Sequence, residues 1–142
     1  MIALDKAALA EKLGAHAYVD SSSEDAALAL QKLGGACVVL ATAPDSKSMT
    51  AMVKGLGPNG TLLVVGAGME PLGVNPIQLI TGRHSMRGWA SGTAKDSEDT
   101  MQFSALTGVR PMIEKYPLEK AAEAYQQMIS GRARFRAVLT MS

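Results

Sequence analysis

The chain has 142 residues, of which 47% are apolar and 19% charged, a composition typical of one folded globular domain and not of a disordered chain. Fourteen basic and thirteen acidic residues leave a formal net charge of +1, which argues against nucleic acid as a partner. No apolar run is long enough for a membrane helix and no signal-peptide pattern begins the chain, so we expect a cytoplasmic protein without a membrane partner. The single cysteine, Cys37, excludes a disulfide within the chain, and its apolar neighbours predict a buried thiol.

The first 35 residues contain two helical patterns with a strand pattern between them. Residues 6–13 predict a short helix with Asp5 as its N-cap and Gly14 as its left-handed C-terminal cap. The β-forming residues at 16–20 predict a strand. Residues 24–33 predict the second helix, which ends at a pair of glycines.

Two apolar runs, at residues 37–41 and 61–65, are expected to be buried strands. Runs that are apolar at nearly every position, and not at alternate ones, are typical of parallel strands covered by helices on both faces. Apolar residues between them recur at helical spacing: Met49, Met52, Val53 and Leu56. Two parallel strands joined by a helix predict a right-handed crossover unit.

The second half of the sequence continues the alternation of helix and strand. In chain order we expect a helix from Asn75 to Gly82, a strand at 85–90, a helix at 96–106, an extended piece at 111–114, a helix at 118–129 and a strand at 135–140. On the last strand, Arg132, Arg134 and Arg136 are expected to point to one side. This order predicts an α/β fold with a parallel sheet in one continuous domain.

Ligands of such sheets bind beyond the carboxyl ends of the strands, which directs attention to residues 42–44, 66–68 and 89–91. Gly66-Ala67-Gly68 is not a dinucleotide fingerprint, because Pro71 stands where the third glycine would be. A strand end without side chains lets a flat ring approach the backbone, but a plain turn explains these glycines equally well. No metal-ligand pattern or nucleophile elbow is present in the sequence, and the arginines near the C-terminus fit either phosphate binding or a solvated edge.

Three segments carry a resemblance to a known family: residues 13–20, residues 56–61, and residues 116–124 with 130–136. Together and in this order they resemble the zinc-type alcohol dehydrogenases of the medium-chain dehydrogenase/reductase family, over the whole chain. The resemblance implies an incomplete Rossmann-like, doubly wound parallel sheet that lacks the first two strands and the glycine fingerprint. It also implies that residues 1–142 are the C-terminal portion of an NAD(P)-binding domain, with the catalytic zinc domain absent.

Members of that family move a hydride between an alcohol or aldehyde and a nicotinamide, and zinc polarises the substrate oxygen. The implied cofactor is NAD or NADP, and no zinc ligand or catalytic residue is implied within this chain. The residues that the resemblance implies for cofactor binding are Thr42 and Ala43 on the ribose and adenine side, Val65, Gly66 and Ala67 against the nicotinamide, Trp89 and Ser91 at its carboxamide, and Arg136 at the pyrophosphate. We expect this chain alone to be inactive and to bind NADH very weakly, because the pyrophosphate-binding turn is missing.

The implied partners are the remainder of the dehydrogenase and a second copy of the chain, which would pair through the strand Ser85 to Ala90. In the Rossmann strand order, the missing strands would separate Tyr18 and Val19 from the strand at 37–41. We therefore expect the apolar face and the open edge of the strand at 37–41 to be exposed to association, and the isolated segment to be marginally stable. Two other functions stay open: a non-catalytic truncated module for oligomerisation or weak nucleotide binding, and an unrelated doubly wound ligand-binding domain.

Overall fold

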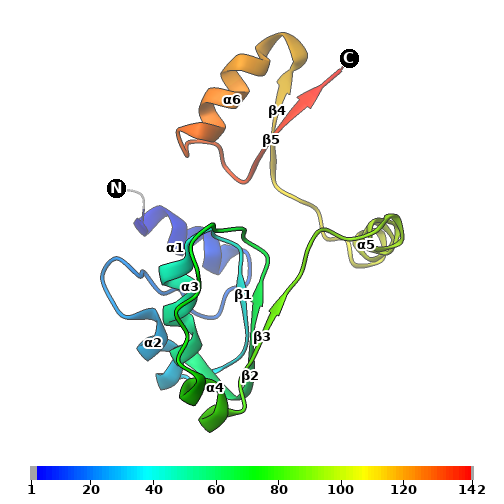
Figure 1. Cartoon of the computed structure of the whole chain (residues 1–142). Helices are drawn as coiled ribbons and strands as arrows, with labels where there is room; N and C mark the ends of the chain where they lie inside the picture. The colour runs from blue at the N-terminus through cyan, green and yellow to red at the C-terminus, as the bar shows by residue number, and fades with distance from the viewer. Residues whose placement is uncertain (1–2, 142) are drawn as a thin grey trace. The chain divides into compact units, whose positions relative to one another are not determined.

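The computed structural model describes residues 3–141, with side chains from residue 6 onward. The chain divides into two compact units, residues 1–91 and residues 92–142 (Figure 1). Each unit contains a parallel β-sheet with helices in the connections, so the predicted α/β class is confirmed. In the described residues, no helix has the length and apolar character required to cross a bilayer.

The first unit is built on a parallel sheet of three strands in the order β1-β2-β3. The strands are β1 (Ala36–Ala41), β2 (Leu56–Val64) and β3 (Ser85–Gly88). Helix α3 (Ser46–Met52), followed by a 3-10 turn at Val53–Gly55, connects β1 to β2. Helix α4 (Pro76–Gly82) precedes β3. The register pairs Val39 with Leu62 and Leu62 with Met86, so these side chains share one face of the sheet.

The core of this unit lies on that face. Val53, Leu56 and Leu62 are its buried centre, as the helical spacing in the sequence predicted for the first two. Residues packed against them come from all three strands, from α3 and α4, and from the loop before α4: Val39, Ala41, Met52, Val64, Val74, Leu79 and Met86. Helices α2 (Ala26–Lys32), α3 and α4 lie on this side of the sheet (Figure 1).

The opposite face of β1 is open, and the expectation of a strand covered on both faces is wrong. Val38 and Leu40 alternate with the core-facing Val39 and Ala41 and are 60% and 58% exposed. Cys37 is also exposed, against the prediction of a buried thiol. A uniformly apolar run requires a layer of helices on each side, and in this unit the helices that pack on the sheet lie on one side.

The predicted strand at 16–20 is absent. Those residues form neither helix nor strand between α1 (Ala3–Lys12) and α2. A strand exists only with a hydrogen-bonding partner, and β1 pairs with β2 alone, so the β-forming residues Tyr18 and Val19 have no strand beside them. The preceding helix is confirmed, and Gly14 has the expected positive φ of 97°.

Several helix boundaries differ from the sequence prediction, among them the start of α1, the start of α2 and the end of α4. Helix α1 begins at Ala3, so Asp5 lies within it and is not the cap. Helix α2 is capped by Asp25, whose carboxylate accepts hydrogen bonds from the backbone N–H groups of Ala27 and Leu28. At the end of α4 the left-handed residue is Arg83, with φ 52°, in place of Gly82.

The second unit contains a parallel pair of strands, β4 (Ile113–Pro117) and β5 (Arg136–Thr140). Between them run a 3-10 turn at Leu118–Lys120 and helix α6 (Ala121–Ile129). Helix α5 (Ala94–Thr107) begins with the predicted capping box of Thr93 and Asp96.

The prediction for the last strand was wrong at its start. Phe135 has a φ of 65° and β5 begins only at Arg136, so the extended alternation of the three arginines is broken. A residue in the left-handed region turns the backbone and ends the two-residue period.

Candidate functional site

The carboxyl ends of the three strands of the first unit meet at one rim of the sheet. Beyond β2, the N–H groups of Val65 and Gly66 both donate to the carbonyl oxygen of Ala41 at the end of β1, at 3.0 and 2.9 Å. Beyond β3, the N–H of Trp89 donates to the carbonyl oxygen of Val64 at 2.9 Å. The predicted segments at 65–67 and 89–91 therefore leave the sheet side by side.

Gly66 brings the segments after β1 and β2 into direct contact. A Cβ at this position would lie 2.7 Å from the carbonyl oxygens of both Thr42 and Ala43. These are backbone atoms, which cannot rotate away as a flexible side chain can. Glycine is required here for backbone packing, so the close approach that the sequence suggested is to the chain itself.

A pocket of about 440 Å³ opens at this rim. Its walls come from the end of β2 (residues 64–68), the end of β3 (residues 88–90), two residues of α3, and the loop after β2: Ser46, Met49, Glu70 and Leu72. We call it the rim pocket. Its volume falls in the range of small-molecule sites, and Val65 and Trp89 give it exposed apolar and aromatic surface.

The backbone groups at the rim are divided between internal bonds and open positions. The N–H groups of Val65, Gly66 and Trp89 are already used within the sheet. Within the described residues, no hydrogen bond involves the backbone of Ala67, Ala90 or Ser91. These three residues have backbone groups available for the amide of a bound ring, whereas the N–H of Trp89 does not.

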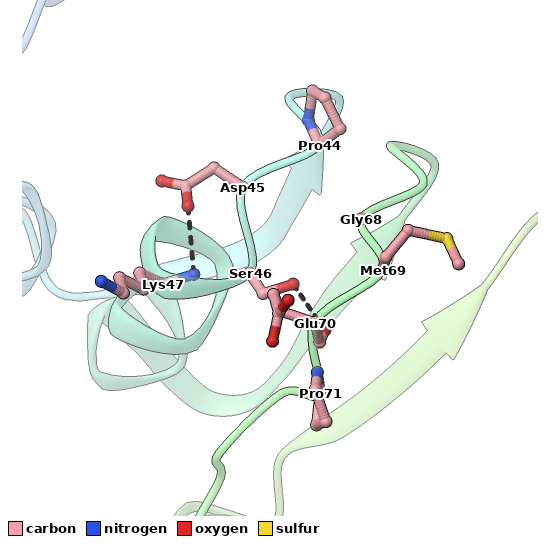
Figure 2. Close-up of a pocket in the computed structure, with 8 residues that line it drawn as sticks. All are labelled: Pro44, Asp45, Ser46, Lys47, Gly68, Met69, Glu70 and Pro71. Carbon is pink, nitrogen blue, oxygen red and sulfur yellow. Dashed lines mark hydrogen bonds between the residues drawn. The ribbon is translucent and has the colours of Figure 1, made fainter.

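A second hollow, of about 510 Å³, lies beside the start of α3 (Figure 2). It is lined by residues 44–47 on one side and residues 68–71 on the other. Ser46 Oγ bridges the two sides, because it donates a hydrogen bond of 2.7 Å to the carbonyl oxygen of Glu70 (Figure 2). Ser46, Gly68 and Glu70 line both this hollow and the rim pocket.

Asp45 fixes the beginning of α3. Its carboxylate accepts hydrogen bonds from the backbone N–H groups of Lys47 and Ser48 and from the Ser48 hydroxyl. The Ser48 hydroxyl is the main cause that lowers the pKa of the Asp45 carboxyl, because it stabilises the charged form. Asp45 is therefore a structural cap with its oxygens occupied.

The structure places the predicted site residues in two groups. Thr42, Ala43, Val65, Gly66, Ala67, Trp89 and Ser91 all belong to the rim of the first unit, while Arg136 begins β5 in the second unit. Beside Arg136, the Glu114 carboxylate accepts hydrogen bonds from the backbone N–H of Arg134 at 2.8 Å and from the Tyr116 hydroxyl at 3.0 Å. The hydrogen bond to Glu114 raises the pKa of Tyr116. The role of each residue in cofactor binding stays a prediction.

The sequence did not indicate Ser46, Met49, Glu70 or Leu72 as part of this site. Met49 was predicted to be a core residue, and it is buried. Ser46 and Glu70 are separated by 24 positions, and neither residue belongs to a motif that relates them. Only the folded loop brings them together.

The described residues offer no site for a metal ion. Among residues 3–141, no three histidine, cysteine, aspartate or glutamate side chains gather closely enough to hold one. His16 and His84 are therefore not accompanied by the further histidine, cysteine or carboxylate side chains that a zinc site requires. The residues present do not fit zinc.

A parallel sheet with helices in its connections defines the α/β class, whose ligands bind beyond the carboxyl ends of the strands. The family model described as zinc-binding dehydrogenase matches residues 2–106, and the chain belongs to this family. Among curated proteins, the chain is 44% identical over 138 residues to alcohol dehydrogenase patD of Penicillium expansum and 40% identical over 137 residues to alcohol dehydrogenase notN of Aspergillus sp.. Each alignment covers 96% of this chain and 40% of the relative.

Solved structures agree with this family. An alcohol dehydrogenase zinc-binding domain protein from Burkholderia ambifaria superposes with a TM-score of 0.89 at 26% identity, over 100% of this chain and 40% of that one. Benzyl alcohol dehydrogenase from Acinetobacter calcoaceticus gives a TM-score of 0.87 at 20% identity and supports the fold alone. The chain thus spans about 40% of the length of these relatives.

Proposed function

We propose that this chain forms the nicotinamide side of the cofactor site of an NAD(P)-dependent alcohol dehydrogenase. The observation that carries the proposal is the rim pocket, in which the ends of β2 and β3 lie side by side. The family match and the identity to proteins named alcohol dehydrogenases support it.

The residues at the rim can bind and orient a flat ring. Trp89 and Val65 supply apolar surface for one side of the ring, and Ala67, Ala90 and Ser91 supply open backbone groups for its carboxamide. For Arg136, in the second unit, the family resemblance and not the geometry of the rim assigns the pyrophosphate. The nicotinamide, when bound, supplies the hydride acceptor or donor for the alcohol or aldehyde.

An NADH titration followed by NMR tests this assignment. We expect saturable but weak binding, with a dissociation constant on the order of 1 mM or higher, and shifts at Ala67, Ala90 and the Trp89 indole. Micromolar affinity would contradict the expectation of weakness, and no shifts at the rim would contradict the site. Arg136→Gln should weaken binding severalfold while Arg132→Gln, whose guanidinium bonds to Ser130, should leave it unchanged.

The alternative of a non-catalytic module for oligomerisation or weak nucleotide binding is favoured by the open face of β1, with its exposed Val38 and Leu40. Reading the coding sequence upstream of Met1 separates the two. An in-frame extension with cysteine and histidine zinc ligands would establish a complete dehydrogenase. A stop codon there would favour the module.

A further inference from the structure

The loop after β2 forms part of the rim pocket but has little structure of its own. Residues 67–74 belong to neither helix nor strand. Within residues 3–141, the bond from Ser46 is the one hydrogen bond that involves this segment. At its far end Val74 packs against the core, while Met69 near its start is almost fully exposed.

Ser46 is placed to hold this loop. Ser46 is only 8% exposed. Among the residues that the structure describes, it is the one polar residue that is buried. As the first residue of α3, it is fixed by a helix that Asp45 caps and that buries Met49. Its hydroxyl spans 24 positions of sequence to reach the Glu70 carbonyl at 2.7 Å (Figure 2).

Gly68 lets the loop approach the Ser46 hydroxyl closely. A Cβ at Gly68 would lie 2.9 Å from Ser46 Oγ and 3.3 Å from the carbonyl oxygen of Pro44. The glycine and the serine therefore form one contact, which fixes the loop against the start of α3. Both residues line the rim pocket.

We infer that Ser46 is a positioning residue: through its bond to the Glu70 carbonyl, it sets the wall of the rim pocket against which the nicotinamide lies. The inference rests on the proposed function for the identity of the ligand. The placement of residues 67–72 by Ser46 does not depend on that ligand. Without the hydroxyl, the Glu70 carbonyl loses its partner and the loop loses its tie to α3.

The test compares three variants of the whole chain: Ser46→Ala, Ser46→Thr, which keeps the hydroxyl, and Ser48→Ala as control. Ser48 is exposed on the same helix start and bonds to Asp45. The first measurement is backbone amide 15N relaxation, which needs no ligand and reports motion even where an N–H makes no hydrogen bond. We expect Ser46→Ala to lower the order parameters of the amides within residues 67–72 from about 0.85 toward about 0.6 and to leave Leu62 to Val64 of β2 unchanged.

The second measurement is the NADH titration by NMR. Ser46→Ala should weaken binding about tenfold, and Ser46→Thr and Ser48→Ala should stay within about twofold of the unsubstituted chain. Unchanged order parameters in Ser46→Ala overturn the inference. Lower order parameters with unchanged NADH affinity also overturn it, because Ser46 would then be structural only.

Gly68→Ala tests the same contact independently, because its added Cβ displaces the loop while the Ser46 hydroxyl remains. It should reproduce the lowered order parameters at residues 69–72, and unchanged order parameters would count against the contact. If the unsubstituted chain shows no NADH binding while Ser46→Ala lowers the order parameters of the loop, the proposed function fails and the placement of the loop by Ser46 stands.

Discussion

Gly66 is the residue on which the geometry of the rim depends most. Gly66→Ala would place a Cβ 2.7 Å from two backbone oxygens, so the segments after β1 and β2 must separate. We expect a loss of about 1–3 kcal/mol in the free energy of unfolding, together with loss of NADH binding. Urea unfolding measures the first quantity. Gly73→Ala is the matched control, because nothing lies within 4 Å of its added Cβ, and it should change stability by less than about 0.5 kcal/mol.

Asp45 gives the first unit a dependence on acid. Its pKa is lower in the folded chain than the ordinary value of 3.8, chiefly because of the Ser48 hydroxyl. A carboxyl with a lowered folded pKa stabilises the fold above its unfolded pKa, and this contribution is lost as the pH falls through the folded pKa. The loss should therefore begin below about pH 4.

Asp45→Asn should flatten that acid dependence, because the amide still caps α3 but does not titrate. Urea unfolding at several pH values between neutral and strongly acidic measures the slope. Ser48→Ala should reduce the slope in the same direction, since it removes the main cause of the lowered pKa. An identical slope in both variants and the unsubstituted chain would refute this role of Asp45.

At the scale of the elements, Arg83 carries a backbone conformation that glycine adopts more easily. It ends α4 with φ 52° and ψ 41°, and its N–H donates to the carbonyl oxygens of α4. Arg83→Gly should therefore stabilise the chain by about 0.5–1 kcal/mol. Arg87→Gly, in the middle of β3, should have the opposite sign, because glycine weakens a strand. Thermal melts of the two variants test this: the melting temperature should rise in Arg83→Gly and fall in Arg87→Gly.

The sequence predicted elements well where local pattern and packing agree. The spacing of Met49, Val53 and Leu56 correctly predicted buried residues, although α3 ends at Met52 and Leu56 already begins β2, and the capping box located the start of α5. It failed at Tyr18 and Val19, because β propensity cannot supply the neighbouring strand that a sheet requires. It failed also at Phe135, whose left-handed backbone has no signal in a pattern of side chains.

The site residues were likewise predictable where they depend on local pattern, and not where they depend on how a loop folds. Strand ends are local features, so the meeting of residues 65–67 with Trp89 was predictable from parallel topology. The bond between Ser46 and Glu70 depends on how a loop without helix or strand folds back, and no periodicity encodes it. The apolar run alone predicted helices on both faces of β1, whereas the truncation that the family resemblance implies predicted the open face that Val38 and Leu40 form.

At the scale of the whole molecule, the three-stranded sheet has two free edges, β1 and β3. Residues 36–43 at β1 carry no charge, and Val38 and Leu40 are exposed beside that edge, whereas β3 carries Arg87. Unprotected apolar edge strands associate with other strands. We expect sedimentation to show concentration-dependent association and the melting temperature to rise with protein concentration.

Single substitutions locate the edge that is used. Leu40→Lys places a charge beside β1 and should shift the chain toward monomer if copies pair there. Pairing through Ser85 to Ala90, as the family resemblance implies, would instead be weakened by Arg87→Glu if the paired strands bring acidic side chains close together. A cooperative melt of a monomer, independent of concentration, would refute both, since the open sheet would then be stable without any strand beside it.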